Sequence, residues 1–189
     1  MPFAIDNRRR KLESLKKLYS DALIIDVTSK SEQPWIKFSP FYPHGNIPLP
    51  LSANCFAASV EGIWQGLKVF ESDDIDTTKF AISNMKGLKR TVRKYGRCLG
   101  HRAGVNGLQL LSYKQARLQI YLPVYQWVLD NCLQQEIAQL EEKNREQLII
   151  LLDYETNGDI ENLTKPLSHA SLIIKYINGQ YPAPVKSFP

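Results

Sequence analysis

Three polar residues at helical spacing are the first sign of chemistry in this sequence. Glu61, Gln65 and Lys68 occupy positions i, i+4 and i+7 of "SVEGIWQGLKVF", and this spacing puts them on one stripe of a helix. The other directions of that helix are mostly apolar, so we expect it to be buried. Buried charge is costly unless it is paired. The stripe therefore either reaches solvent or lines a polar pocket in the interior, and the spacing alone leaves both interpretations open.

A rigid segment precedes this helix. Residues 40–54 contain four prolines, at positions 40, 43, 48 and 50. Proline has no N–H to donate, so the segment is predicted to be an ordered loop with at most an edge strand. Ser59 is the expected N-cap of the helix, and Glu61 lies in its first turn, where the helix dipole favours a carboxylate. We expect the helix to continue through Phe70.

The segment "FSPFYP" and the following "SVEGIWQGLKVF" resemble the NADAR family, which is named for its NAD and ADP-ribose associations. That family has an aromatic F-S-N-F segment, followed by a helix in which Gln and Lys come four and seven residues after a Glu. Glu61, Gln65 and Lys68 match this spacing residue for residue. The segments "MKGLKRTVRKYGR", "LSYKQARLQIYLPVYQWVLDN" and "IILLD" are similar to later parts of the family, so the resemblance covers about residues 35–160.

The chain also departs from the family pattern. Pro40 stands where the family has the Asn of F-S-N-F, and "PLSHASLI" replaces the family's C-terminal acidic and W-G motif. Residues 1–34 have no family counterpart. These departures keep a non-catalytic ADP-ribose or nucleotide-binding module as an alternative to an enzyme.

The resemblance implies an N-glycosidase that cleaves a ribose–base bond in an ADP-ribosylated or phosphorylated nucleoside-type substrate, including ADP-ribose on guanine. Loss of the base leaves oxocarbenium-like charge on the ribose, which a nearby carboxylate stabilises. A second acid or base must protonate the base or activate water. We assign Glu61 as the carboxylate and Asp153, which follows an apolar strand-like run, as the second group. Gln65 then orients Glu61 or the ribose hydroxyls, and Lys68 contacts phosphate.

Aromatic and basic residues complete the predicted site. Aromatic side chains can hold the base, and core packing is the other explanation of these rings, above all for Trp64. Residues 86–102 carry seven Lys or Arg and no acid, and they are expected to form a basic helical stripe that is either solvated or bound to a polyanion. The predicted substrate-binding residues are Phe38, Phe41, Tyr42, Trp64, Gln65, Lys68, Lys89, Arg90, Arg93, Arg97, His101 and Arg102.

Composition limits the other possibilities. The 189 residues carry a formal net charge of +5, which also fits a basic nucleic-acid-binding protein as a third function. No apolar run is long enough to span a membrane, and the N-terminal residues do not resemble a secretory signal. Cys55, Cys98 and Cys132 lack metal-binding spacing. We therefore expect a cytoplasmic protein with reduced thiols, no metal, no cofactor and no membrane partner.

The expected fold is α+β, a helix-rich single domain over residues 1–189 with a small sheet. It begins with a helix and a strand in residues 1–34 and ends in a Pro-rich tail at 181–189. Helices are predicted at 6–20, 59–70, twice within 73–96, at 112–146 with a kink or break at Pro123, and at 166–179. Strands are predicted at 22–29 and 34–39, a strand or short helix at 147–159, and a glycine-rich loop at 99–107.

Overall fold

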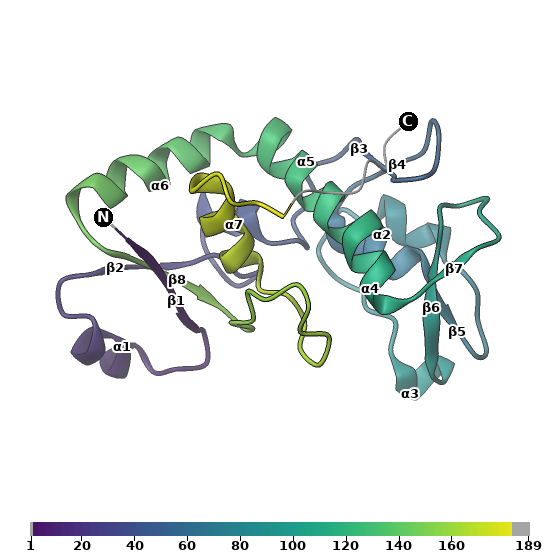
Figure 1. The fold of residues 1–189 in the computed structure, drawn as a ribbon, viewed down its shortest axis with the longest axis horizontal. Coiled ribbons are helices and arrows are strands. Elements are labelled where there is room, and N and C mark those ends of the chain that lie inside the picture. The colour runs from purple at the N-terminus through teal and green to yellow at the C-terminus, as the bar shows by residue number, and fades with distance from the viewer. Residues whose placement is uncertain (1, 183–189) are drawn as a thin grey trace. The chain divides into compact units, whose positions relative to one another are not determined.

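The chain combines helices with small β-sheets, which confirms the predicted α+β class (Figure 1). The structure is a computed structural model that describes residues 2–182. These residues divide into two compact units. Unit 1 contains residues up to 39 and residues 129–182, and unit 2 contains residues 40–128. The single domain over residues 1–189 stays a prediction, and most of the predicted Pro-rich tail lies outside the described residues.

Unit 1 is built on a three-stranded parallel sheet in the order β1 (Phe3–Asn7), β8 (Ile149–Asp153) and β2 (Leu23–Asp26). The central strand β8 has the sequence IILLD, and all five of its residues are buried. A continuous apolar run of this kind is typical of a strand that is covered on both faces. The predicted strand at 22–29 and the strand alternative for 147–159 are therefore confirmed.

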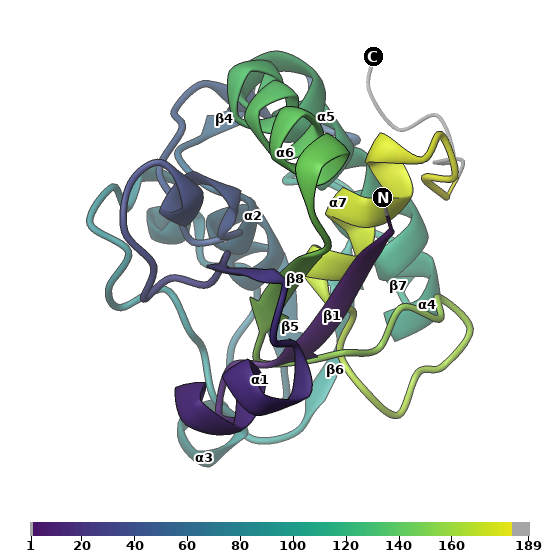
Figure 2. The same ribbon diagram turned by 90° about the vertical axis from the view of Figure 1, so that its left-hand side faces the viewer.

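Helices cover both faces of this sheet, as Figure 2 shows. Leu15 of α1 (Leu12–Leu18) packs against Ile150 and Leu152 on one face. Alternate strand residues point to the opposite face, where Asp153 holds the N-terminus of α7 (His169–Ile177). Unit 1 also contains the 3₁₀-helix η1 (Trp35–Phe38) and helix α6 (Gln134–Glu146).

Unit 2 contains two antiparallel sheets and several short helices. Strands β3 (Ile47–Pro48) and β4 (Phe56–Ala57) form one pair, and β5 (Lys68–Phe70), β6 (Cys98–Arg102) and β7 (Leu110–Leu111) form a three-stranded sheet. The helical elements are α2 (Val60–Gly66), the 3₁₀-helix η2 (Thr77–Ala81), α3 (Val92–Tyr95), α4 (Tyr113–Ala116) and the π-helical turn η3 (Arg117–Tyr121). Helix α5 (Leu122–Cys132) begins in unit 2 and ends in unit 1.

Two glycines determine which side of α2 packs against the protein. The Ser59 hydroxyl accepts a hydrogen bond from the Gly62 N–H at 3.0 Å, so the predicted N-cap is confirmed. Gly62 and Gly66 face η2: a Cβ on Gly62 would lie 2.8 Å from the Lys79 carbonyl oxygen, and one on Gly66 would lie 2.3 Å from the Phe80 ring. Because these positions allow the backbones to approach closely, the side that carries Glu61 and Gln65 is left for other contacts.

The helix ends earlier than predicted, at Gly66 rather than Phe70. Lys68 is the first residue of β5, where it pairs with His101 of β6. The single helical stripe of Glu61, Gln65 and Lys68 was therefore wrong: the first two residues are on α2 and the third is on a strand. Pairing with β6, a segment about thirty residues further along the chain, outweighed the helical periodicity.

Two further corrections concern unit 1. The predicted helix at 6–20 is helical only at Leu12–Leu18, because Phe3–Asn7 pairs with β8 as strand β1. The predicted strand at 34–39 is the short 3₁₀-helix η1, whose N-cap Pro34 already has right-handed helical dihedrals. The predicted caps of the last helix are confirmed: Ser168 accepts from the Ser171 N–H, and Gly179 has a positive φ.

The remaining corrections concern unit 2 and α6. The two helices expected within 73–96 are reduced to η2 and the single turn α3, although Gly96 does end the second. The predicted glycine-rich loop at 99–107 begins inside strand β6. The long helix at 112–146 is divided into α4, η3, α5 and α6, and the π-helical turn ends at Tyr121, two residues before Pro123. A break at this proline was predicted because it cannot donate to the helical ladder.

The packing of Gly66 against Phe80 predicts a specific cost. Gly66→Ala should lower the free energy of unfolding by about 1–3 kcal/mol through overpacking, although alanine alone favours a helix by about 1 kcal/mol. Urea unfolding measures this change. The same substitution in a Phe80→Leu background should cost less, and an equal cost in both backgrounds would contradict the proposed contact.

Candidate functional site

Glu61 is a buried carboxyl group with defined hydrogen bonds. Its residue is 9% exposed, and its Oε1 accepts a hydrogen bond from Gln65 Nε2 at 2.8 Å. Its backbone N–H donates to the Pro40 carbonyl at 2.8 Å. The aromatic segment before the helix is thus joined to the turn that carries Glu61, and Pro40 makes this contact through its backbone.

Gln65 is fixed from both ends of its side-chain amide. Its Nε2 donates to Glu61, and its Oε1 accepts the backbone N–H of Arg90 at 3.0 Å. These two bonds fix the orientation of the amide, because only the nitrogen can donate and only the oxygen can accept. Of the two predicted roles of Gln65, the structure contains the contact that orients Glu61.

The surroundings of Glu61 shift its titration. Burial raises the pKa of Glu61, while the hydrogen bond from Gln65 and the charges of Lys68 and Lys89 act in the opposite direction. Burial also lowers the pKa of Lys68, and the charge of Glu61 opposes that change. Burial therefore disfavours charge on both groups, and shifted pairs of this kind are common at catalytic sites.

Aromatic rings cluster around Trp64, which lies near Lys68. The ring centroid of Trp64, on α2, lies 3.9 Å from that of His101. It lies 5.9 Å from the centroid of Tyr113 and 5.6 Å from that of Tyr121. The Lys68 Nζ lies 6.0 Å from the Trp64 centroid. The two tyrosines are not among the site residues predicted from the sequence. Their spacing of eight residues in a helical segment, which places them near one face, is the signal that could have revealed them.

His101 is a neutral buried residue. Burial, assisted by the nearby charge of Lys68, lowers its pKa to about 3. The backbone of Trp64 favours the protonated ring, although neither ring nitrogen forms a hydrogen bond of normal geometry with a described residue. A neutral imidazole cannot contribute the positive charge expected of a phosphate-binding residue. The predicted substrate contact of His101 would therefore be a hydrogen bond rather than an ion pair.

The other predicted aromatic residues have different surroundings. The Lys89 Nζ lies 5.5 Å from the ring centroid of Phe41. Because the charge of Lys89 acts on Glu61, Phe41 and Lys89 both belong to the neighbourhood of Glu61. The ring centroids of Tyr42 and His44 lie 4.9 Å apart. Phe38 belongs to unit 1, where it is fully buried and stacks with Trp35. Core packing explains Phe38.

Arg90 is buried beside the site and holds several backbone segments together. Its side chain is 0% exposed, and its guanidinium donates to the carbonyls of Lys68 and Asp74 and to the carboxylate of Asp73. The guanidinium also lies over the Phe70 ring. These bonds connect the chain on both sides of β5. Arg90 is therefore engaged within the protein rather than presented to a ligand.

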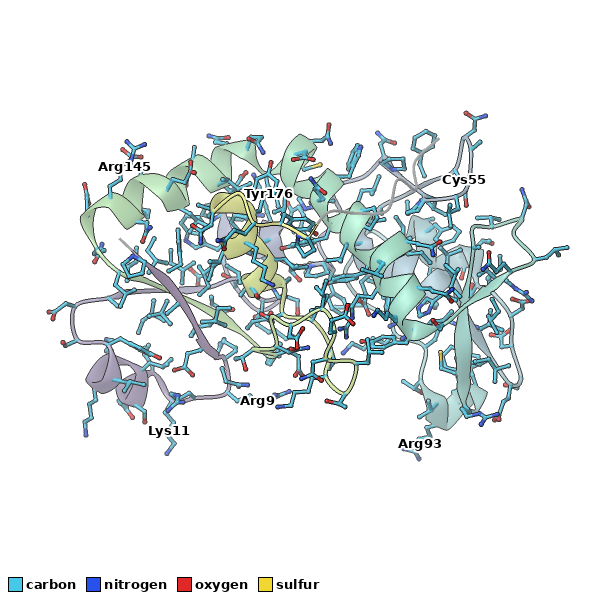
Figure 3. All side chains as sticks on the ribbon, viewed as in Figure 1. Arg9, Lys11, Cys55, Arg93, Arg145 and Tyr176 are labelled. Carbon is cyan, nitrogen blue, oxygen red and sulfur yellow. The ribbon has the colours of Figure 1, made fainter. Side chains whose placement is uncertain are left out.

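The predicted basic stripe does not form. Met85 and Gly87 have positive φ values, which interrupt a helix, and helix α3 begins only at Val92. Acidic residues from the preceding segment neutralise part of the charge: Arg97 pairs with Glu71, and Arg102 pairs with Asp74. Arg93 of α3 is exposed (Figure 3).

Asp153, the predicted second acid, lies in unit 1 within a network of its own. Its Oδ2 accepts from the Ser168 hydroxyl at 2.8 Å and the Ala170 N–H at 3.3 Å, and it pairs with His169 Nδ1 at 2.9 Å. The other ring nitrogen of His169 faces the Val27 carbonyl at 2.9 Å. Because both ring nitrogens face acceptors, the ring is held as an imidazolium. Asp153 therefore anchors α7 to the sheet of unit 1.

This ion pair predicts how stability depends on pH. Burial alone would lower the pKa of His169, but Asp153 and the Val27 carbonyl raise it above its usual value. Burial would raise the pKa of Asp153, yet the contacts with His169, Ser168 and Ala170 lower it. The stabilisation should be lost as pH rises through the raised pKa of His169, and also as pH falls through the lowered pKa of Asp153.

Nuclear magnetic resonance titration of His169, with urea unfolding across the same pH range, measures this dependence. In His169→Gln the loss of stability on the alkaline side should disappear. A His169 that titrates at or below the ordinary pKa of histidine, about 6.5, would contradict the imidazolium.

The described residues contain neither a metal-binding cluster nor a bilayer-crossing helix. In residues 2–182, no three His, Cys, Asp or Glu side chains come together in a way that could hold a metal ion. Over the same part of the chain, no helix has both the length and the apolar character that crossing a bilayer requires.

Comparison with known proteins identifies a family without a known activity. Residues 7–173 match the family of unknown function DUF6939, and the chain belongs to this family. A search of curated proteins finds no match.

Proposed function

We propose that this protein is a NADAR-like N-glycosidase that hydrolyses a ribose–base bond in an ADP-ribosylated or phosphorylated nucleoside-type substrate. One observation carries the proposal: the buried carboxyl of Glu61 is oriented by Gln65 and lies within the electrostatic influence of Lys68 and Lys89. A carboxyl group that is fixed, desolvated and shifted toward a higher pKa has the properties of a catalytic acid or base. The sequence resemblance supplies the reaction class.

In the proposed reaction, ionised Glu61 faces the ribose carbon as its bond to the base breaks. The carboxylate stabilises the positive charge that develops on the sugar. Its raised pKa also makes it a stronger base than an exposed glutamate, so it can take a proton from the water that attacks the sugar carbon. The base departs with the bonding electron pair, and protonated Glu61 then passes the proton to it. Gln65 keeps the carboxylate in place during both steps, because its own amide is held by Arg90.

Cationic and aromatic groups next to Glu61 suit the rest of such a substrate. Lys68 and Lys89 are the predicted phosphate contacts whose charges reach Glu61. Trp64 and Phe41, each close to one of these lysines, can stack with a base or ribose. Asp153 is not used in this mechanism, since its carboxylate already holds His169 and α7. The proposal includes a cytoplasmic location, which the three free cysteines favour.

Two other functions remain distinct alternatives. A non-catalytic ADP-ribose or nucleotide-binding module would bind the same ligands through the same residues without releasing a base. A basic nucleic-acid-binding protein would bind unmodified duplex with a steep dependence on salt. The pairing of Arg97 and Arg102 with acidic residues reduces the charge available for that third function.

Base release tests the proposal. The purified protein is incubated with DNA carrying ADP-ribosylated guanine, with ADP-ribosyl nucleosides and with NAD, and released base is measured by chromatography. Glu61→Gln should lower the rate roughly 10²–10⁴-fold, the usual contribution of a positioned acid or base. Glu141→Gln, at an exposed position of α6, is the matched control and should leave the rate unchanged. Absence of release from every substrate, or release that survives Glu61→Gln, refutes the assignment.

The same variant has a predicted effect on stability. The raised pKa of Glu61 means that ionising this carboxyl is less favourable in the folded protein than in the unfolded chain. The contribution of Glu61 is therefore most favourable at low pH and is lost as pH rises through its folded-state pKa. Relative to the natural protein, Glu61→Gln should become more stable as pH increases over this range. Urea unfolding at several pH values measures the difference, and a constant difference would show that Glu61 is not desolvated.

A further inference from the structure

Strand β2 is an edge of the parallel sheet in unit 1, and one side of its backbone is unused. The Leu23 N–H donates to the Leu148 carbonyl at 2.8 Å, and the Val27 N–H donates to the Leu152 carbonyl at 3.2 Å. Parallel ladders use alternate residues, so Ile24 and Asp26 direct their backbone groups away from β8. Within residues 2–182, no hydrogen bond uses these outward N–H and C=O groups.

A cavity of about 420 Å³ runs alongside this open edge. All four residues of β2 line it, and the rest of its lining comes from the segment from Lys30 to Glu32, from Trp35 and from Lys143 of α6. The volume is within the range of small-ligand sites, about 300–1,000 Å³. An open strand edge inside a hollow, rather than on a flat surface, is the arrangement that receives an added strand.

The charges around the cavity favour an acidic occupant. Asp26 is already paired with Arg8. Among the described residues, Lys30 and Lys143 form no ion pair, and Glu32 is the only other acidic group in the lining. Two lysines therefore face a single unpaired carboxylate. Trp35, which is half-buried and stacks on Phe38, offers an apolar surface for a neighbouring side chain.

We propose that the cavity beside β2 binds an extended peptide segment of a partner protein. This segment has apolar side chains and at least one acidic residue, and its backbone adds to the sheet next to β2. The partner backbone would pair with the outward groups of Ile24 and Asp26. An apolar side chain would lie against Trp35, and the carboxylate would lie between Lys30 and Lys143. A second copy of this chain is a poorer occupant, because edge-to-edge pairing would bring the same lysines of both copies together.

The test uses a blocked peptide of alternating valine and threonine that begins with two glutamates. Calorimetry measures its affinity, and hydrogen exchange measures protection of the Ile24 and Asp26 amides. Binding should protect these two amides. The affinity for the peptide should fall roughly three- to tenfold in Ile24→Pro, because this substitution removes one outward N–H and so one hydrogen bond. Ile24→Val keeps the N–H and should bind normally.

A second variant tests the charge without altering the sheet. Lys143→Glu, at an exposed position of α6, should lower the affinity for the glutamate peptide. It should raise the affinity for a matched peptide that begins with two lysines. The inference is overturned if peptides with N-methylated backbones bind equally well, if the two amides stay unprotected, or if Lys143→Glu changes neither affinity. A dimer in sedimentation that Ile24→Pro abolishes would also overturn it, since β2 would then pair with its own copy. None of these results depends on Glu61.

Discussion

Burial of the Glu61 carboxyl group is the constraint on which the rest of unit 2 depends. A carboxylate removed from water costs free energy unless it is paired and hydrogen-bonded. Here the chain supplies Gln65 one turn later on the same helix and holds that amide with the backbone of Arg90. The helix can approach the protein closely enough for this because Gly62 and Gly66 have no side chains toward η2.

Arg90 is a second buried charged group whose side chain needs partners within the protein. A fully buried guanidinium needs partners for its donors, and its two terminal nitrogens find them in three backbone carbonyls and the Asp73 carboxylate. Its Nε has no hydrogen-bond partner among the described residues. Removing the Asp73 carboxylate would leave the buried guanidinium without its ion-pair partner, and breaking a buried pair in this way typically costs several kcal/mol. The same residue thus fixes the end of α2, the start of β5 and the amide that orients Glu61. At this position, the basic composition of residues 86–102 serves the structure of the protein itself.

The parts of the fold that the sequence predicted are those determined locally. Ser59 and Ser168 cap helices through their own hydroxyls, and Gly96 ends a helix through its own backbone conformation. Strand β1 was missed because Phe3–Asn7 becomes a strand only by pairing with residues 149–153. For the site, the contact between Glu61 and Gln65 follows from helical spacing, whereas the placements of His101, Tyr113 and Tyr121 depend on strand register and tertiary packing.

The predicted spacing of Glu61, Gln65 and Lys68 therefore has a different physical meaning from a helical stripe. The first interval of four residues is one helical turn, and it sets the hydrogen bond to the carboxyl. The last interval crosses from helix to strand: Leu67 is the C-cap of α2, and Lys68 is the first residue of β5, opposite His101. Successive strand residues point to opposite faces, so one inserted residue after Gly66 would turn the lysine away from Glu61. The distance of seven residues is fixed by this junction.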